Sequence, residues 1–203
     1  MSQPMLPGAE TQFSTRKDTH RLAELRRLLI LDSTVERVYD DMTLLLAHSL
    51  EVPIAMINML DDQRDWFKSS VGMANRQSSA EWSFCNVFFT STEDFVVVED
   101  ATQDARFATH PFVVGAPFVR FYAAARLTVA GHTVGTLCVR DEKPRRISTE
   151  QILQMQTLAN AVVDLLNQRA GSSSTASEFM ERLRGIQVNH RDVRDLGTLR
   201  AQV

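Results

Sequence analysis

The chain has 203 residues, of which 44% are hydrophobic and 23% charged, and 22 basic against 25 acidic side chains leave a formal charge of -3. This is the composition of an ordinary globular protein with a sizeable core. It excludes the basic surface of a nucleic-acid-binding protein. No apolar run is long enough to span a membrane, and the first residues lack the apolar centre of a secretory signal, so we expect a cytoplasmic protein.

The residue patterns divide the chain into three parts. Residues 1–18 lack apolar periodicity and predict a flexible N-terminal arm, whereas residues 19–171 carry all the clear patterns of a folded domain. The run Gly171-Ser172-Ser173-Ser174 predicts a break, so residues 172–203 are expected to be a linker and a short C-terminal tail.

Three segments show the periodicity of helices. Leucines recur at spacings of three and four from Arg21 onward, and a second helix is predicted behind the capping-box pattern of residues 33–36, ending near Leu50. A third helix is predicted behind a similar pattern at residues 148–151, and we expect it to end near Gly171.

The middle of the chain has the pattern of strands. Residues 119–129 alternate most clearly, and a short irregular helix opened by Ser83 is expected within residues 82–89. Strands that follow one another as hairpins, with helices at the ends, predict an α+β domain with a central antiparallel sheet flanked by helices. The strands are expected over residues 53–60, 65–71, 95–98, 119–129 and 132–140.

No catalytic signature occurs in the sequence. Phosphate-binding loops, nucleophile elbows and paired metal-binding motifs are missing, so no enzymatic activity is predicted and no metal site is assigned. Cys85 and Cys138 lie far apart in the sequence. They are interpreted as half-buried thiols, with a reactive thiol or a redox pair as the alternative if the two side chains meet.

Aromatic residues gather in the middle of the chain, together with a few polar and basic groups. Rings with convergent polar groups are typical of a small-molecule pocket, but rings that simply fill the core beneath irregular loops would give the same composition. The aromatic residues are Trp66, Phe67, Trp82, Phe84, Phe88, Phe89, Phe107, Phe112, Phe118, Phe121 and Tyr122.

A series of short blocks over about residues 20–170 resembles the GAF domain family, of the stand-alone bacterial type. Each block is weakly specific, but the blocks occur in the family's order. They are Leu28-Leu29-Ile30-Leu31-Asp32-Ser33, Val52-Pro53-Ile54-Ala55, Asp65-Trp66-Phe67-Lys68-Ser69, Ser83-Phe84-Cys85, Val97-Val98-Glu99-Asp100-Ala101, Asp104-Ala105-Arg106-Phe107, Arg120-Phe121-Tyr122-Ala123 and Gly135-Thr136-Leu137-Cys138-Val139-Arg140-Asp141.

The resemblance implies a sheet of five or six strands with helices on one side and a ligand cavity on the other. In such a fold the segments near Ser83 and over residues 104–118 cover the pocket, and strand residues form its floor. Arg120 or Arg126 would meet an anionic ligand, unless these arginines face solvent. The ligand-binding residues that the resemblance implies are Trp66, Ser83, Phe84, Cys85, Phe107, Arg120, Phe121, Tyr122 and Cys138.

Some features depart from well-known branches of the family. No Asn-Lys pair is present, which disfavours a cyclic nucleotide, and Cys85 is followed by Asn86 instead of the His that is usual beside a covalent bilin. The two cysteines do not reproduce the set of free methionine sulfoxide reductases built on this fold. The ligand and any cofactor therefore stay unassigned.

The family resemblance predicts a sensory domain that binds an unidentified small molecule and signals through a partner protein or a homodimer. Wide apolar stripes on the first and last helices favour the dimer. The alternative is a structural dimerisation module whose own rings close the cavity, and a thiol-based redox switch is a further alternative.

Overall fold

The computed structural model describes the backbone of residues 15–189 and the side chains of residues 15–172. Its centre is a six-stranded antiparallel sheet with the strand order β3-β2-β1-β6-β5-β4. The predicted α+β class is confirmed. The strands are β1 (Ile54–Leu60), β2 (Arg64–Val71), β3 (Gln77–Ser79), β4 (Phe95–Val98), β5 (Phe121–Val129) and β6 (His132–Asp141).

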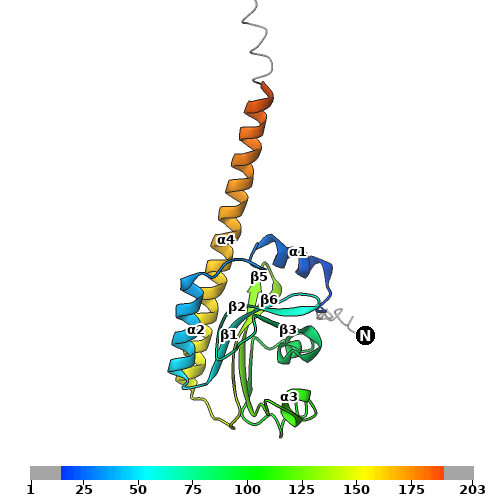
Figure 1. Cartoon of the computed structure of the whole chain (residues 1–203), viewed down its shortest axis with the longest axis vertical. Helices are drawn as coiled ribbons and strands as arrows, with labels where there is room; N and C mark the ends of the chain where they lie inside the picture. Colours follow the sequence, from blue (N-terminus) through cyan, green and yellow to red (C-terminus); the bar gives the residue numbers. More distant parts are fainter. Residues whose placement is uncertain (1–14, 190–203) are drawn as a thin grey trace, which may run out of the picture.

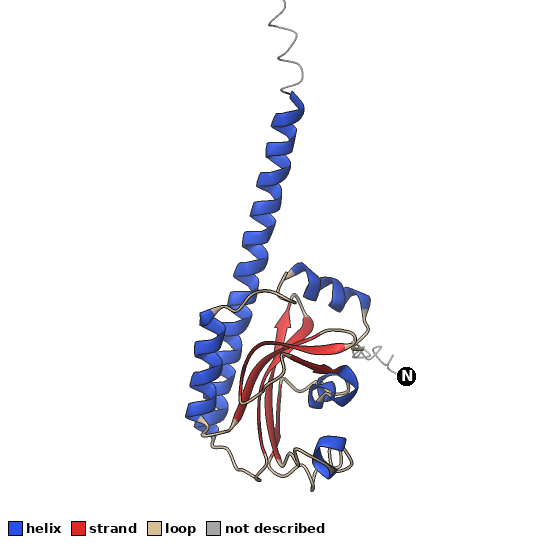
Figure 2. Ribbon diagram, in the orientation of Figure 1, coloured by secondary structure: helices blue, strands red, loops and turns tan. Residues whose placement is uncertain are grey.

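The helices lie on both faces of the sheet, but unequally (Figure 1). The long helices α2 and α4 lie side by side on one face, and short helical turns cover the other (Figure 2). Among the described residues, the α-helices are α1 (Thr19–Arg27), α2 (Arg37–Ser49), α3 (Pro111–Val114) and α4 (Thr149–Asn189), and the 3₁₀ helices are η1 (Ala80–Trp82) and η2 (Phe84–Phe89). In this described part of the chain, no helix is long and apolar enough to cross a membrane.

The sheet separates two hydrophobic cores because successive side chains of a strand point to opposite faces. In β5, Phe121 and Ala123 enter the core beneath α2 and α4, whereas Tyr122 and Ala124 enter the core beneath η2 and α3. We call these the helical-face core and the loop-face core. The loop-face core contains Met56, Leu60, Phe67, Phe84, Cys85, Val87, Phe88, Val96, Val98, Ala101, Phe107, Val113, Val119, Tyr122, Ala124 and Cys138.

The two predicted capping boxes have different outcomes. At α4 the Ser148 hydroxyl accepts a hydrogen bond from the Gln151 amide, and the Gln151 side chain accepts one from the Ser148 amide, as expected. At α2 the prediction is wrong, because Glu36 is the N-cap residue and makes no side-chain cap. Its carboxylate accepts hydrogen bonds from Lys68 Nζ at 2.6 Å and from Arg169 at 2.7 Å.

Helix α4 does not end near Gly171, which corrects the expected break. The helix continues for 41 residues to Asn189, a length of about 60 Å. A single glycine in a helix interior costs only about 1 kcal/mol relative to alanine, so a Gly-Ser run does not by itself stop a helix. The division into arm, domain and tail stays a prediction, since residues 1–14 and 190–203 lie outside the described residues.

The last described residues of the predicted arm are held against the domain. Asp18 caps α1 by accepting a hydrogen bond from the Arg21 amide at 2.8 Å. The Arg16 side chain is largely buried and donates to Asp65 and to the side-chain oxygen of Asn86.

Candidate functional site

An aromatic cluster lies at the centre of the loop-face core. Phe84 opens η2 directly after Ser83, whose hydroxyl caps that helix, and its ring lies 5.1 Å from Phe107 and 5.3 Å from Tyr122. His110 completes the cluster at 4.2 Å from Phe84. Four rings from three separate segments therefore meet at the beginning of β5.

A sulfur cluster lies beside these rings. The Cys85 sulfur accepts hydrogen bonds from Asn58 Nδ2 and from the Tyr122 hydroxyl, both at 3.4 Å, and lies 3.1 Å from the Thr136 hydroxyl. A hydrogen bond from Cys138 lowers the pKa of Cys85 to about 6, and the same contact, with burial, raises the pKa of Cys138 well above its ordinary value. The two cysteines thus meet in space, although both are fully buried.

A buried carboxylate holds the edge of this region together. Asp65 accepts hydrogen bonds from Asn58 at 3.0 Å and from the Ser83 hydroxyl at 2.5 Å, and it forms an ion pair with Arg16. Arg16 also donates to Asn86 at 2.8 Å, within η2. This network connects the start of the described chain to the segment that covers the aromatic cluster.

A cavity of about 400 Å³ opens at the edge of the aromatic cluster. Three of the predicted site residues, Ser83, Phe84 and Phe107, border it, and Cys85, Tyr122 and Cys138 pack together in the same core without lining it. Concave sites of this size with aromatic walls and a few polar groups are typical of small-molecule binding. The full lining is Glu81, Ser83, Phe84, Asn86, Val87, Thr90, Arg106, Phe107 and His110.

The remaining predicted residues are not part of this cluster. Trp66 and Phe121 lie in the helical-face core, on the other side of the sheet, which corrects the expectation that both form the pocket floor. Strand alternation explains the result, since neighbouring residues such as Phe121 and Tyr122 must face opposite ways. Arg120 donates to the carbonyl oxygens of Val113 and Val119, so its charge is used within the protein.

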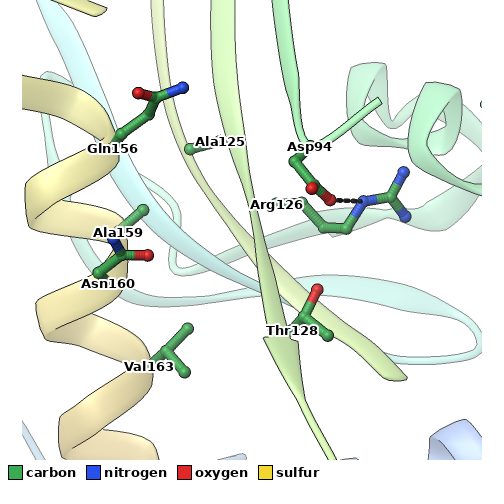
Figure 3. A pocket seen from close by; sticks show the side chains of 8 residues that line it. All are labelled: Asp94, Ala125, Arg126, Thr128, Gln156, Ala159, Asn160 and Val163. Carbon is green, nitrogen blue, oxygen red and sulfur yellow. Dashed lines mark ion pairs between the residues drawn. The ribbon is translucent and has the colours of Figure 1, made fainter. Parts of the chain in front are cut away.

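Arg126 is likewise bound by the protein itself. It donates to the carbonyl oxygens of Phe88 and Ser91, both at 2.8 Å, and forms an ion pair with Asp94 at 3.3 Å. It borders a second hollow of about 430 Å³ between β5 and α4, where Gln156 and Asn160 project from the helix (Figure 3).

Sequence analysis missed three polar residues of the loop face: Asp65, His110 and Arg140. Burial lowers the pKa of His110, and the nearby charge of Arg140 lowers it further, while the backbone of Trp82 acts in the opposite direction. Arg140 follows Cys138 by two positions in β6, so strand alternation was a signal that both face the same core. Among the described residues, no group of His, Cys, Asp and Glu is placed to hold a metal ion.

The fold and the cavity define an α+β domain with a long-helix face and a loop-covered face. The chain belongs to the GAF domain family, whose sequence model matches residues 34–164. It is 38% identical over 141 residues to a cyclic di-GMP phosphodiesterase of Pseudomonas aeruginosa, an alignment that covers 68% of this chain and 24% of the relative. The chain thus matches about a quarter of that protein's length.

Solved structures share the fold at low sequence identity. The GAF domain of an Acinetobacter phosphoenolpyruvate-protein phosphotransferase superposes with a TM-score of 0.56 at 18% identity, covering 76% of this chain and 98% of that one. The blue-light absorbing form of the Thermosynechococcus elongatus PixJ GAF domain also has a TM-score of 0.56, at 16% identity, with coverage of 77% and 95%. These similarities establish the fold alone.

Proposed function

We propose that this GAF domain is a sensory module that binds a small molecule in the loop-face cavity. The observation that carries the proposal is the cavity itself, which has aromatic walls from Phe84 and Phe107 and polar groups from Ser83, Asn86 and His110. A molecule held there would contact η2 and the segment around Phe107, both of which pack over the sheet.

The sheet provides a physical route from this cavity to the long helices. Tyr122 reaches the aromatic cluster from β5, and the neighbouring Phe121 and Ala123 enter the core beneath α4. Helix α4 packs against both β5 and β6. A shift of these strands on binding would therefore reach α4, which we propose carries the signal onward.

The relative from Pseudomonas aeruginosa supports a role in signal transduction. Its name assigns it the hydrolysis of cyclic di-GMP, and the matched segment is a minor part of its length. We propose that the present domain likewise regulates a signalling activity through a partner protein or through a second copy of itself. Nothing in the cavity assigns cyclic di-GMP itself as the ligand.

A homodimer through the helical face is part of this proposal. On α2, Leu44 and Leu45 are 59% and 53% exposed, and Leu153 on α4 is 57% exposed. Exposed leucines on two adjacent helices favour self-association. The double substitution Leu44→Glu and Leu45→Glu should convert a dimer to a monomer in light-scattering measurements, with the far-ultraviolet circular dichroism spectrum as the control for folding.

Ligand binding is tested by thermal stability against a panel of metabolites, because a ligand that binds only the native state raises the melting temperature. Thr90→Phe places a ring in the cavity that Thr90 lines, whereas Thr128→Phe changes the hollow beside α4. We expect a stabilising compound for the wild type and for Thr128→Phe, and loss of the effect in Thr90→Phe.

The alternative function is a structural dimerisation module with no ligand. The complete burial of Phe84 and Tyr122, which pack against each other, favours it. If no compound changes the melting temperature while the protein is a dimer, the sensory proposal is wrong and this second function is correct.

A further inference from the structure

Arg140 is a buried cation with no ion-pair or hydrogen-bond partner in the part of the chain that the structure describes. Only 7% of the residue is exposed, and it lies in β6 between Ile54 of β1 and Tyr122 of β5. Its guanidinium carbon is 4.9 Å from the centre of the Phe84 ring. The Nε atom is buried and makes no hydrogen bond, and no ion pair or hydrogen bond joins the guanidinium to any other residue that the structure describes.

Two other arginines, Arg21 buried and Arg126 partly buried, show what this fold provides elsewhere. Arg21 lies over the Phe89 ring and donates to the carbonyl oxygens of Leu60 and Thr133 at 2.7 and 3.1 Å. Arg126 lies over the Phe88 ring and donates to three carbonyl oxygens and to the Thr133 hydroxyl. Of these three ring-stacked arginines, Arg140 alone has no acceptor among residues 15–172.

No carboxylate of the described residues pairs with Arg140. The adjacent Asp141 is engaged with Arg145. The charge of Arg140 lowers the pKa of four neighbouring groups. They are His110, Tyr122 and the two cysteines, Cys85 and Cys138. A buried ion is costly unless it is paired, so this arrangement favours the entry of an anion.

We propose that Arg140 anchors the oxyanion, a carboxylate or phosphate, of the small molecule that the loop-face cavity binds. The planar guanidinium can bind two oxygens of such a group at once. Phe84 contacts the guanidinium and also lines the cavity, so movement of this one ring would connect the two. The inference rests on the proposed function, and it replaces Arg120 and Arg126 as the group that meets an anionic ligand.

The test compares wild type with Arg140→Met and Arg126→Met in thermal unfolding. The probes are benzoate and inorganic phosphate, with chloride at equal ionic strength and neutral benzamide as controls. We expect benzoate or phosphate at millimolar concentration to raise the melting temperature of wild type and Arg126→Met by about 3 °C or more, and benzamide and chloride to have no such effect. A response to benzoate alone identifies a carboxylate, and a response to phosphate alone identifies a phosphate group.

Arg140→Met should lose the response to the anion. Without any anion, its melting temperature should equal or exceed that of wild type, because a buried unpaired charge has been removed, whereas Arg126→Met should melt lower. Arg140→Lys retains the charge but lacks the planar guanidinium that can bind two oxygens at once. This variant should retain a reduced thermal response to the anion. The circular dichroism spectrum confirms that each variant is folded.

Three results would overturn the proposal. An undiminished anion response in Arg140→Met would place the anion elsewhere, and a lower melting temperature of this variant without anion, comparable to that of Arg126→Met, would mean that the charge already has a partner. If no anion stabilises the wild type, the oxyanion site is wrong. Stabilisation by an uncharged metabolite would then still support the sensory function.

Discussion

Lys68 and Arg140 are both buried cations that lie over an aromatic ring, but they are on opposite faces of the sheet. Lys68 is 3% exposed and 5.0 Å from the Tyr39 ring, and Nζ donates to Glu36, to the Ser33 hydroxyl and to the Thr34 carbonyl. Arg140 has an equivalent ring but no acceptor among the residues that the structure describes. Within this part of the chain, the helical face supplies a counter-charge for its buried cation and the loop face does not.

The loop face does contain a buried carboxylate, so a general lack of acidic residues does not explain why Arg140 is unpaired in the described part of the chain. Asp65 lies on the same face, fully buried, and pairs with Arg16, Asn58 and Ser83. The ion pair of Asp65 and Arg16 shows that the chain does pair a buried charge on this face when that charge has a structural role. Among the described residues, the lack of a partner is therefore specific to Arg140, as expected for a binding group.

The largest effect is expected for Asp65→Ala. Removing this carboxylate leaves the largely buried Arg16 without its ion pair and also breaks the bonds from Asn58 and Ser83. The free energy of unfolding should fall by about 3–5 kcal/mol, measured by urea denaturation. The neighbouring Asp62→Ala is the control and should change it by less than about 0.5 kcal/mol. Equal effects of the two variants would contradict the structural role of Asp65.

A smaller loss is expected for Lys68→Met, the counterpart of Arg140→Met. The substitution removes three hydrogen bonds that join β2 to the segment before α2. Because Glu36 keeps its bond to Arg169, the free energy of unfolding should fall by about 2 kcal/mol. Exposed Lys143→Met is the control in the same denaturation experiment. If Lys68→Met were as stable as wild type, the contrast between the two cations would be lost.

The pH dependence of stability provides a third test of the contrast between Lys68 and Arg140. Folding lowers the pKa of His110 below 6.5, mainly through burial and then through the charge of Arg140. The unfolded state therefore binds the proton more readily, so stability falls as the pH decreases through 6.5 toward the folded-state pKa. Arg140→Met should raise the pKa of His110 in ring-proton NMR titration and reduce this loss of stability. An unchanged His110 titration would show that the two groups do not interact.

The smallest effect is expected for alkylation of the cysteines. Both thiols are fully buried, so native protein should incorporate almost no iodoacetamide at neutral pH, although the pKa of Cys85 is low. Denatured protein should incorporate two equivalents, as measured by mass spectrometry. Rapid modification of native Cys85 would instead favour the thiol-based switch.

The fold was largely predictable because the spacing of apolar residues along the chain reflects which side chains are buried. Five of the six strands, the position of α2, the start of α4 and the short helix opened by Ser83 followed from alternation, apolar spacing and capping residues, but the short edge strand β3 was not predicted. The hairpin between β5 and β6 was also correct, with Ala130 and Gly131 both at positive φ in its turn. The same S-x-x-E/Q pattern succeeded at Ser148 and failed at Ser33, because Lys68 competes for Glu36 in the folded chain.

The candidate site was only partly predictable because its polar contacts join distant segments. The rings of Phe84, Phe107 and Tyr122 were identified by their type and do meet. Trp66 and Phe121 were misplaced because the family resemblance was followed where strand alternation already separated Phe121 from Tyr122. The contact between Arg16 and Asp65 spans 49 positions, and no local pattern signals such a pair.

The uninterrupted α4 has a mechanical consequence. A helix of 41 residues is nearly rigid along its length, so its far end magnifies any change of direction imposed by the sheet. The last described core residue of α4 is Ala170, so the helix extends about 28 Å beyond it, and a tilt of about 5° would displace Asn189 by about 2.5 Å. Small rearrangements around Tyr122 would in this way become larger movements, at a distance where another protein can detect them.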